Sequence, residues 1–188
     1  AVSYSQTILI SGQLGYYNPK GDLFTDKATD KDLASFGIGG EFEALYFLPN
    51  MDEKIGVGIM TTSSIMIGEE SENELEIGLY GLSLYGLKGQ YRLSGMDKKV
   101  TPYGSLAIGL SKFETPDIKD EAGQIVVKGE GASAFGIRPE IGIDLGGFLI
   151  SMAYFVPMNY SFTSDLGDFD GTAGAFSISI GYAAKFNL

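Results

Sequence analysis

The sequence contains no cysteine, no histidine and no tryptophan among its 188 residues. Without cysteine the chain can form no disulfide bond and offers no thiolate chemistry. Without histidine it lacks the commonest general base and metal ligand. Its net charge is −11, so we expect no nucleic-acid partner.

Long apolar runs are also missing. None approaches the roughly 20 residues that a transmembrane helix needs, because Gly, Ser or a charged residue interrupts the apolar stretches every few positions. The opening AVSYSQT has no signal-peptide pattern, and its leading Ala is consistent with a signal that has been removed. The length suits one domain with a sizeable core, and we expect residues 1–188 to form a single domain.

What the sequence has in abundance is strict alternation of large apolar residues with small ones, the pattern of β-strands. It predicts eight strands, over Gln6–Tyr17, Gly37–Leu48, Ile55–Ile67, Leu75–Leu93, Thr101–Phe113, Ala134–Leu145, Phe148–Tyr160 and Ala175–Leu188. Ordinary globular strands have about 5–6 residues, whereas strands as long as these are what a tilted, membrane-spanning barrel requires. We expect a bulge near Tyr80–Leu84, and a bulge or unpaired position at Pro139 and at Pro157.

The connections between these strands are alternately long and short. The short ones are Pro49–Lys54, Ser94–Lys99 and Gly146–Gly147, and the long ones are Asn18–Ala34, Gly68–Glu76, Lys112–Gly131 and Phe162–Gly171. This order predicts an all-β, antiparallel up-and-down meander with every long loop at one end and both termini at the other. The long connections hold 17 acidic and six basic residues, so the whole net charge lies on one rim.

The orientation of the two strand faces separates two architectures. In a soluble lipocalin-like carrier the apolar face lines a ligand cavity, whereas in a membrane barrel it faces lipid. The opposite face is rich in Gly, Ser, Ala and Thr, and it lacks the many Lys, Glu and Gln residues of a solvent surface. Small residues fit the narrow interior of an eight-stranded barrel. The sequence therefore predicts a transmembrane β-barrel with its apolar face outward.

Several charged residues share the inner face in this arrangement. In GIGGEFEALYFL, the alternation places Glu41 and Glu43 on the side of the glycines, which points inward. Buried charges must be paired and hydrogen-bonded, so we expect an ion network that fills the lumen. Its members are Glu41, Glu43, Lys88, Arg92, Arg138 and Glu140, with Asp144 and Lys185 towards the short-turn end. The alternative is that some of them lie near an open end and are hydrated.

Four segments resemble strands of a known superfamily. TPYGSLAIGLSKF, YGLKGQYRL, FGIRPEIGIDL and IGYAAKFNL are similar to strands of small outer-membrane β-barrels of the OmpA, OmpX and opacity-protein type. The last segment resembles the terminal strand read by the outer-membrane insertion machinery, although the chain ends in Leu188 where many members end in Phe. With no Trp, the aromatic girdles would consist of Tyr16, Tyr46, Tyr91, Tyr154, Tyr160 and Phe186.

Catalysis and metal binding are the two kinds of chemistry to consider against this background. The resemblance includes enzymatic barrels such as lipid A deacylases and palmitoyl transferases, which use a His with a Ser, and this chain has no His. Glu41 and Glu43 could do acid–base work, but a structural ion-pair role is far more common, so we expect no enzyme. The carboxylates of Asp165–Gly171 and Gly68–Glu76 could attract calcium, although solvated acidic loops are the simpler interpretation. No cofactor is expected.

The resemblance implies a monomeric, non-enzymatic protein of the bacterial outer membrane, in contact with the lipid bilayer and lipopolysaccharide. Its expected role is structural or surface interaction, with the acidic loops Asn18–Ala34 and Lys112–Gly131 as contact surface, for instance for an extracellular protein. The alternative function is binding or transport of small apolar molecules. In a membrane barrel that cavity would be lined by Met60, Met66, Phe47 and Phe155. A soluble lipocalin-like carrier would need the inverted facing.

Overall fold

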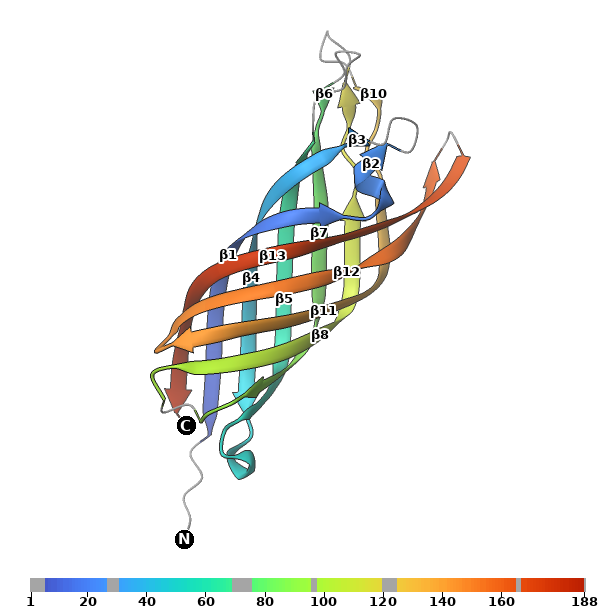
Figure 1. The fold of residues 1–188 in the computed structure, drawn as a ribbon. Helices are drawn as coiled ribbons and strands as arrows, with labels where there is room; N and C mark the ends of the chain where they lie inside the picture. Colours follow the sequence, from blue (N-terminus) through green and yellow to red (C-terminus); the bar gives the residue numbers. More distant parts are fainter. Residues whose placement is uncertain are drawn as a thin grey trace.

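The computed structural model describes residues 6–26, 31–68, 76–95, 98–119, 125–164 and 167–187. Eight long antiparallel strands close into a barrel in the order β1-β13-β12-β11-β8-β7-β5-β4 (Figure 1). Each of these eight strands pairs with the barrel strand that precedes it in the sequence, and β13 closes the barrel against β1. The predicted up-and-down fold is therefore confirmed. The bounds are β1 Thr7–Lys20, β4 Ala34–Phe47, β5 Ile55–Gly68, β7 Leu79–Arg92, β8 Thr101–Glu114, β11 Gly131–Leu145, β12 Phe148–Ser164 and β13 Gly167–Asn187.

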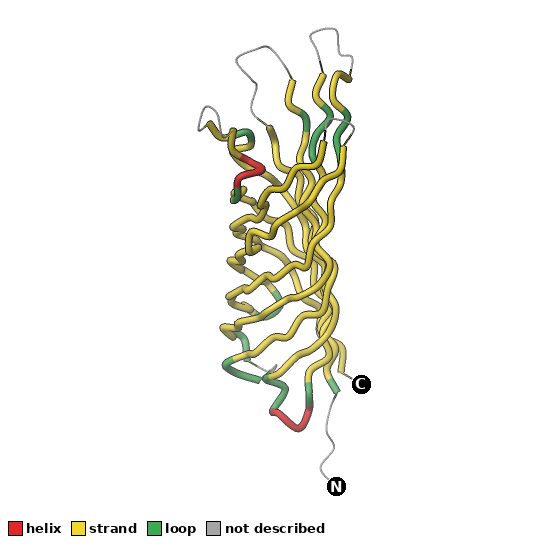
Figure 2. The backbone as a smooth tube through the Cα atoms, turned by 90° about the vertical axis from the view of Figure 1, so that its right-hand side faces the viewer, coloured by secondary structure: helices red, strands yellow, loops and turns green. Residues whose placement is uncertain are grey.

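The two ends of the barrel differ in their connections. Both termini, the turn at Gly146–Gly147 and the short 3-10 helix η2 (Pro49–Met51) lie at one end, here called the terminal end. The opposite end, here called the loop end, carries η1 (Asp22–Phe24) and two small sheets (Figures 1 and 2). These sheets consist of β2 (Thr25–Asp26) with β3 (Lys31–Asp32), and of β6 (Glu76–Ile77), β9 (Ile118–Lys119) and β10 (Ile125–Val127). No helix in the described part is long and apolar enough to cross a membrane.

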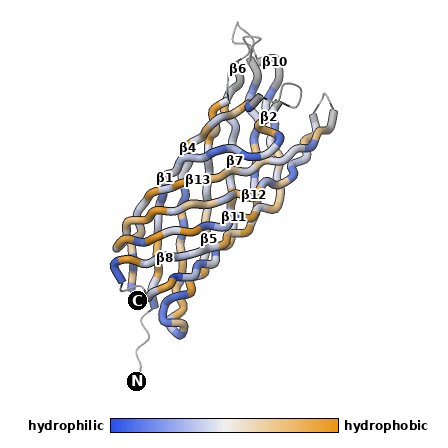
Figure 3. Tube along the Cα trace, in the orientation of Figure 1, coloured by the Kyte–Doolittle hydropathy of each residue, from blue (hydrophilic) through white to orange (hydrophobic). Residues whose placement is uncertain are grey.

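The large apolar side chains cover the outside of the barrel. Leu14 on β1 is 73% exposed and Ile141 on β11 is 66% exposed, whereas the glutamates Glu41 and Glu43 are buried inside. Figure 3 shows the resulting alternation of hydrophobic and polar residues along the strands. The predicted outward apolar face is confirmed, and the soluble-carrier alternative, which requires the opposite facing, is wrong.

Three sequence expectations about strands and loops are corrected. The predicted fourth strand is divided, because β6 pairs with β9 while β7 begins at Leu79. The register of β7 shows no shift between Tyr80 and Leu84 on either side, so the bulge expected there is absent; Tyr80, Leu82 and Leu84 all face inward without one. The loop expected at Phe162–Gly171 is largely strand, since β12 and β13 stay paired as far as Ser164 and Gly167.

The bulge expected at Pro157 is present and changes the phase of β12. The register with β13 shifts between Phe155 and Met158, so residues beyond the bulge point to the opposite side from the one their alternation predicts. Tyr160, expected in the outer aromatic girdle, is fully buried in the barrel interior for this reason. Pro139 pairs with Leu106 of β8 without any register shift, but the ladder between β11 and β12 ends at Glu140, so Pro139 occupies an unpaired position on that side, one of the two outcomes expected there.

Candidate functional site

The middle of the barrel interior is occupied by a cluster of five charged side chains around Lys88 of β7. Its Nζ atom lies 2.9 Å from Glu41 Oε1, 2.6 Å from Glu43 Oε2 and 3.1 Å from Glu140 Oε2. These three acids come from strands β4 and β11, on other sides of the barrel. One ammonium group therefore ties three strands together across the lumen.

Arg138 of β11 completes this cluster, here called the charged layer. Its Nη2 atom lies 2.6 Å from Glu41 Oε2, and its Nη1 atom donates to Glu140 Oε2 at 2.8 Å. Glu43 accepts an additional hydrogen bond of 2.8 Å from Ser11. All five charged side chains are at most 2% exposed, so each carboxylate depends on these cations in place of water.

A second, smaller ion cluster lies nearer the terminal end. Arg92 Nη2 lies 2.8 Å from Asp144 Oδ2, and Lys185 Nζ lies 3.0 Å from the same oxygen. The other carboxylate oxygen of Asp144 accepts a 2.6 Å hydrogen bond from the backbone of Gly147, in the β11–β12 turn. The Arg92 guanidinium is 5.7 Å from the centre of the Phe47 ring. The structure thus places the six residues of the expected network inside the barrel, but in two clusters, with Arg92 apart from the other five.

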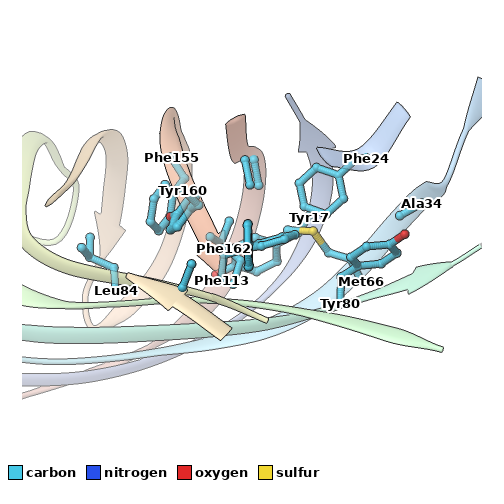
Figure 4. Close-up of a cluster of buried hydrophobic side chains, with 14 of the residues drawn as sticks. Tyr17, Phe24, Ala34, Met66, Tyr80, Leu84, Phe113, Phe155, Tyr160 and Phe162 are labelled. Atoms are coloured by element: carbon cyan, nitrogen blue, oxygen red, sulfur yellow. The ribbon is translucent and has the colours of Figure 1, made fainter. Parts of the chain in front are cut away.

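The loop half of the interior is apolar, and the sequence did not indicate it as a unit. Phe113 of β8 lies at its centre, with ring centroids of Phe24 at 5.3 Å, Tyr160 at 5.5 Å and Phe162 at 6.1 Å (Figure 4). We call this the aromatic cluster; it also includes the buried side chains of Tyr17, Met60, Met66, Tyr80, Leu82, Leu84, Ala107, Ala132, Phe155, Ala173 and Ala175, with Ala34 at its edge. The alternation of inward and outward residues along their strands would have shown that Tyr80 and Phe113 point into the barrel. The contribution of Phe24, which comes from outside the barrel strands, has no such signal.

Phe24 closes this cluster from the loop end. It belongs to η1, and its ring packs against Tyr80 at 5.5 Å and against Phe113. Asp22, at the start of η1, accepts hydrogen bonds from the backbone N–H and the hydroxyl of Thr172 on β13, the latter at 2.7 Å. These bonds hold η1 against the barrel mouth.

The cavity lining suggested by the sequence is not a single surface. Met60, Met66 and Phe155 are buried in the aromatic cluster, while Phe47 belongs to a separate apolar group near the terminal end with Leu45 and Tyr103. The charged layer separates these groups: on β4, Glu41 and Glu43 lie between Ala34 of the aromatic cluster and Leu45 of the terminal-end group. The four residues are therefore packing residues of two cores.

The arrangement offers little for catalysis or metal binding. Glu41 and Glu43 both contact Lys88 and are sealed from solvent, so neither is placed to exchange a proton with a substrate. Within the described ranges no group of three or more Asp and Glu side chains could hold a metal ion; the three glutamates of the charged layer converge on the ammonium group of Lys88 instead. Of the two acidic segments considered for calcium, Gly68–Glu76 lies largely outside the described residues, while the greater part of Asp165–Gly171 belongs to strand β13.

Solved structures of other proteins share this architecture. Neisserial surface protein A (NspA) matches with a TM-score of 0.61 and 11% identity, over 95% of this chain and 97% of that chain. A major outer membrane protein from Thermus thermophilus matches with a TM-score of 0.52 and 10% identity, over 96% and 99%. Ail, the attachment invasion locus protein of Yersinia pestis, gives 0.50 and 16%, over 97% and 100%. No protein-family model matches the sequence, and no curated protein is significantly similar to it.

At these identities the likeness concerns the fold. A closed barrel of eight antiparallel strands with an apolar outer face and a packed interior is the architecture of small outer-membrane β-barrels, the class that the sequence resemblance indicated. An outer-membrane location, as the sequence predicted, agrees with these neighbours.

Proposed function

We propose that this protein is a non-enzymatic, monomeric barrel of the bacterial outer membrane that acts through its acidic loop end, in envelope integrity or in contact with an extracellular partner. The observation that carries the proposal is the filled interior. Lys88 and its three carboxylates block the middle of the lumen, and the aromatic cluster blocks its loop half. Because the interior of an eight-stranded barrel is just wide enough for side chains or for one small ligand, general diffusion through the lumen does not fit this structure.

The loop end is suited to a contact role because its acidic segments rise from a rigid base. In the segment Lys112–Gly131, the backbone of Thr115 donates to the carbonyl of Glu130 at 2.8 Å, and Asp117 accepts from the backbone of Gly129 at 2.7 Å. Functional residues are commonly found on loops held by such a scaffold. The excess of acids favours a basic partner surface, or divalent cations that bridge these loops to lipopolysaccharide.

A loop-charge variant tests this proposal in the bacterium that makes the protein. Six acids of the two loops are changed to amides: Asp26, Asp30, Asp32, Asp120, Glu121 and Glu130. A deletion strain is complemented with the wild-type chain or with this variant, and detergent sensitivity and adhesion to a surface coated with a basic protein are measured. Loss of adhesion with the variant, by tenfold or more, indicates a surface-contact role. Restored detergent resistance with both chains indicates a structural role.

Two controls accompany this experiment. Heat-modifiable migration on gels shows that the variant still folds, and planar-bilayer recordings of the wild-type barrel are expected to show no steady conductance. A deletion strain that differs from its parent in neither property, or a large open-channel conductance, would contradict the proposed function.

Divalent cations give a further expected result. In vesicles containing lipopolysaccharide, chelation with EDTA should lower the urea midpoint of the wild-type barrel, because the acidic loops then face anionic sugars without a bridging ion. The six-amide variant should lose most of this EDTA effect. Equal midpoints with and without EDTA would exclude the bridging role.

A further inference from the structure

One of the eight strand interfaces is incomplete. The β11–β12 ladder pairs six residues of each strand, from Leu145 and Phe148 at the turn to Glu140 and Ala153. The other interfaces are paired over at least 11 residues. All residues of these two strands belong to the described part of the chain. The loop halves of β11 and β12 therefore face each other without a ladder.

Pro139 explains where the pairing stops. The two-residue turn Gly146–Gly147 makes Leu145 and Phe148 the first hydrogen-bonded pair, so alternate residues of β11, including Pro139, direct their backbone towards β12. Proline has no N–H to donate. The ladder therefore loses its next donor at Pro139, while the opposite edge of β11 remains paired with β8 as far as Gly131.

The partner strand becomes irregular at nearly the same level. The bulge of β12 between Phe155 and Met158 contains Pro157, a second residue without an N–H. Beyond it, β12 follows β13, and Figure 1 shows the loop ends of β12 and β13 directed away from those of β8 and β11. We call the unpaired stretch between the loop halves of β11 and β12 the seam.

The side chains at the seam connect the lipid-facing surface with the aromatic cluster. On the outside, Phe135 is 60% exposed and Tyr154 is 41% exposed. On the inside, the β11 wall consists of small residues, and a side chain at Gly136 would come within 2.6 Å of Leu84. Ala134 of β11 and Met158 of β12 are only partly buried, and both pack against the aromatic cluster. At these two residues the apolar interior reaches the surface.

We propose that the seam is a lateral binding site for a small, uncharged apolar molecule, one or two rings in size, that enters from the bilayer. Met158 is flexible and unbranched, so its side chain can swing aside and let the ligand contact Phe155 and Tyr160. The charged layer limits the depth of the site, since Arg138 immediately precedes Pro139. A compact ligand fits this geometry better than a long acyl chain. This site goes beyond the proposed loop-end function and does not depend on it.

The first test measures binding of N-phenyl-1-naphthylamine by fluorescence, with the full chain in lipid nanodiscs. We expect saturable binding above that of empty nanodiscs. Met158→Trp fills the seam and should weaken this binding at least tenfold. The matched control is Met152→Trp on the same strand, where the ladder is intact and the side chain points outward; it should leave the affinity unchanged. Equal affinities for both variants would overturn the proposal, as would binding no greater than that of empty nanodiscs.

Pro139→Ile provides a second variant that does not depend on tolerance of a large side chain. It restores the missing N–H, so the ladder should extend and slow the amide hydrogen exchange of Ile137, while probe binding falls several-fold. Competition identifies the occupant: toluene should displace the probe and hexadecane should not. Unchanged probe binding in Pro139→Ile despite slower exchange would refute the site. Equal displacement by hexadecane would show that the seam holds lipid chains instead.

Discussion

Replacing Lys88 with Met is expected to destabilise the barrel by about 3–5 kcal/mol, the usual cost of removing one partner from a buried ion pair. The substitution keeps most of the side-chain volume but leaves Glu41, Glu43 and Glu140 with Arg138 as their remaining cation in the charged layer. Three buried carboxylates cannot all be stabilised in their charged form by one guanidinium. Urea titration of the protein folded in lipid vesicles, followed by heat-modifiable migration, measures the effect.

The matched control is Lys20→Met, because Lys20 is exposed at the loop end of β1. Exposed substitutions of this kind usually change stability by no more than about 0.5 kcal/mol. Adding Glu43→Gln to Lys88→Met removes one of the orphaned charges and should recover part of the lost stability. If Lys88→Met were as stable as the control, the charged layer would contribute no more than a surface ion pair, and its proposed contribution to stability would be disproved.

The inward position of Lys88 and its partners could be derived from the sequence, because strand alternation is set by backbone geometry alone. Glu41 and Glu43 share a face with glycines, and Arg138 and Glu140 share the corresponding face of their strand. The alternation along one strand does not show which residues of different strands meet across the barrel interior. It therefore could not show that Lys88 meets Glu140 across the lumen while Arg92 pairs separately with Asp144.

The misplaced residues have a common physical origin. An alternation continued through Pro157 puts Met158 and Tyr160 on the lipid face, although one extra residue in a strand reverses the side of every residue after it. The proline predicts the bulge itself, but the pattern does not show its consequence for the following residues.

The closure of the loop end of the barrel by Phe24 depends on a hydrogen bond between Asp22 and Thr172, which are 150 positions apart in the sequence. Local sequence patterns carry no information about such a contact.

The second large expected effect is the loss of stability when a charge is placed on the apolar outer face of the barrel. Leu14→Arg should cost about 2–4 kcal/mol in a bilayer, the range for a basic residue on the lipid face near the membrane midplane. Leu14 lies in the middle of β1 and is 73% exposed, so the new guanidinium would have to sit in hydrocarbon. No steric clash accompanies the change, because the side chain points away from the barrel. The loss of stability in urea, measured in lipid vesicles, therefore reports the surroundings of this face.

Val100→Arg is the control, since Val100 is 56% exposed and directly precedes β8 at the terminal end. Near the membrane interface the cost of a basic residue falls to about 0–1 kcal/mol. The difference between the two costs then reports how much deeper Leu14 lies in the bilayer than Val100, because both changes add the same charge to an exposed apolar position. If Leu14→Arg cost no more than Val100→Arg, the apolar belt would not lie in hydrocarbon, and the membrane-spanning position of the barrel would be disproved.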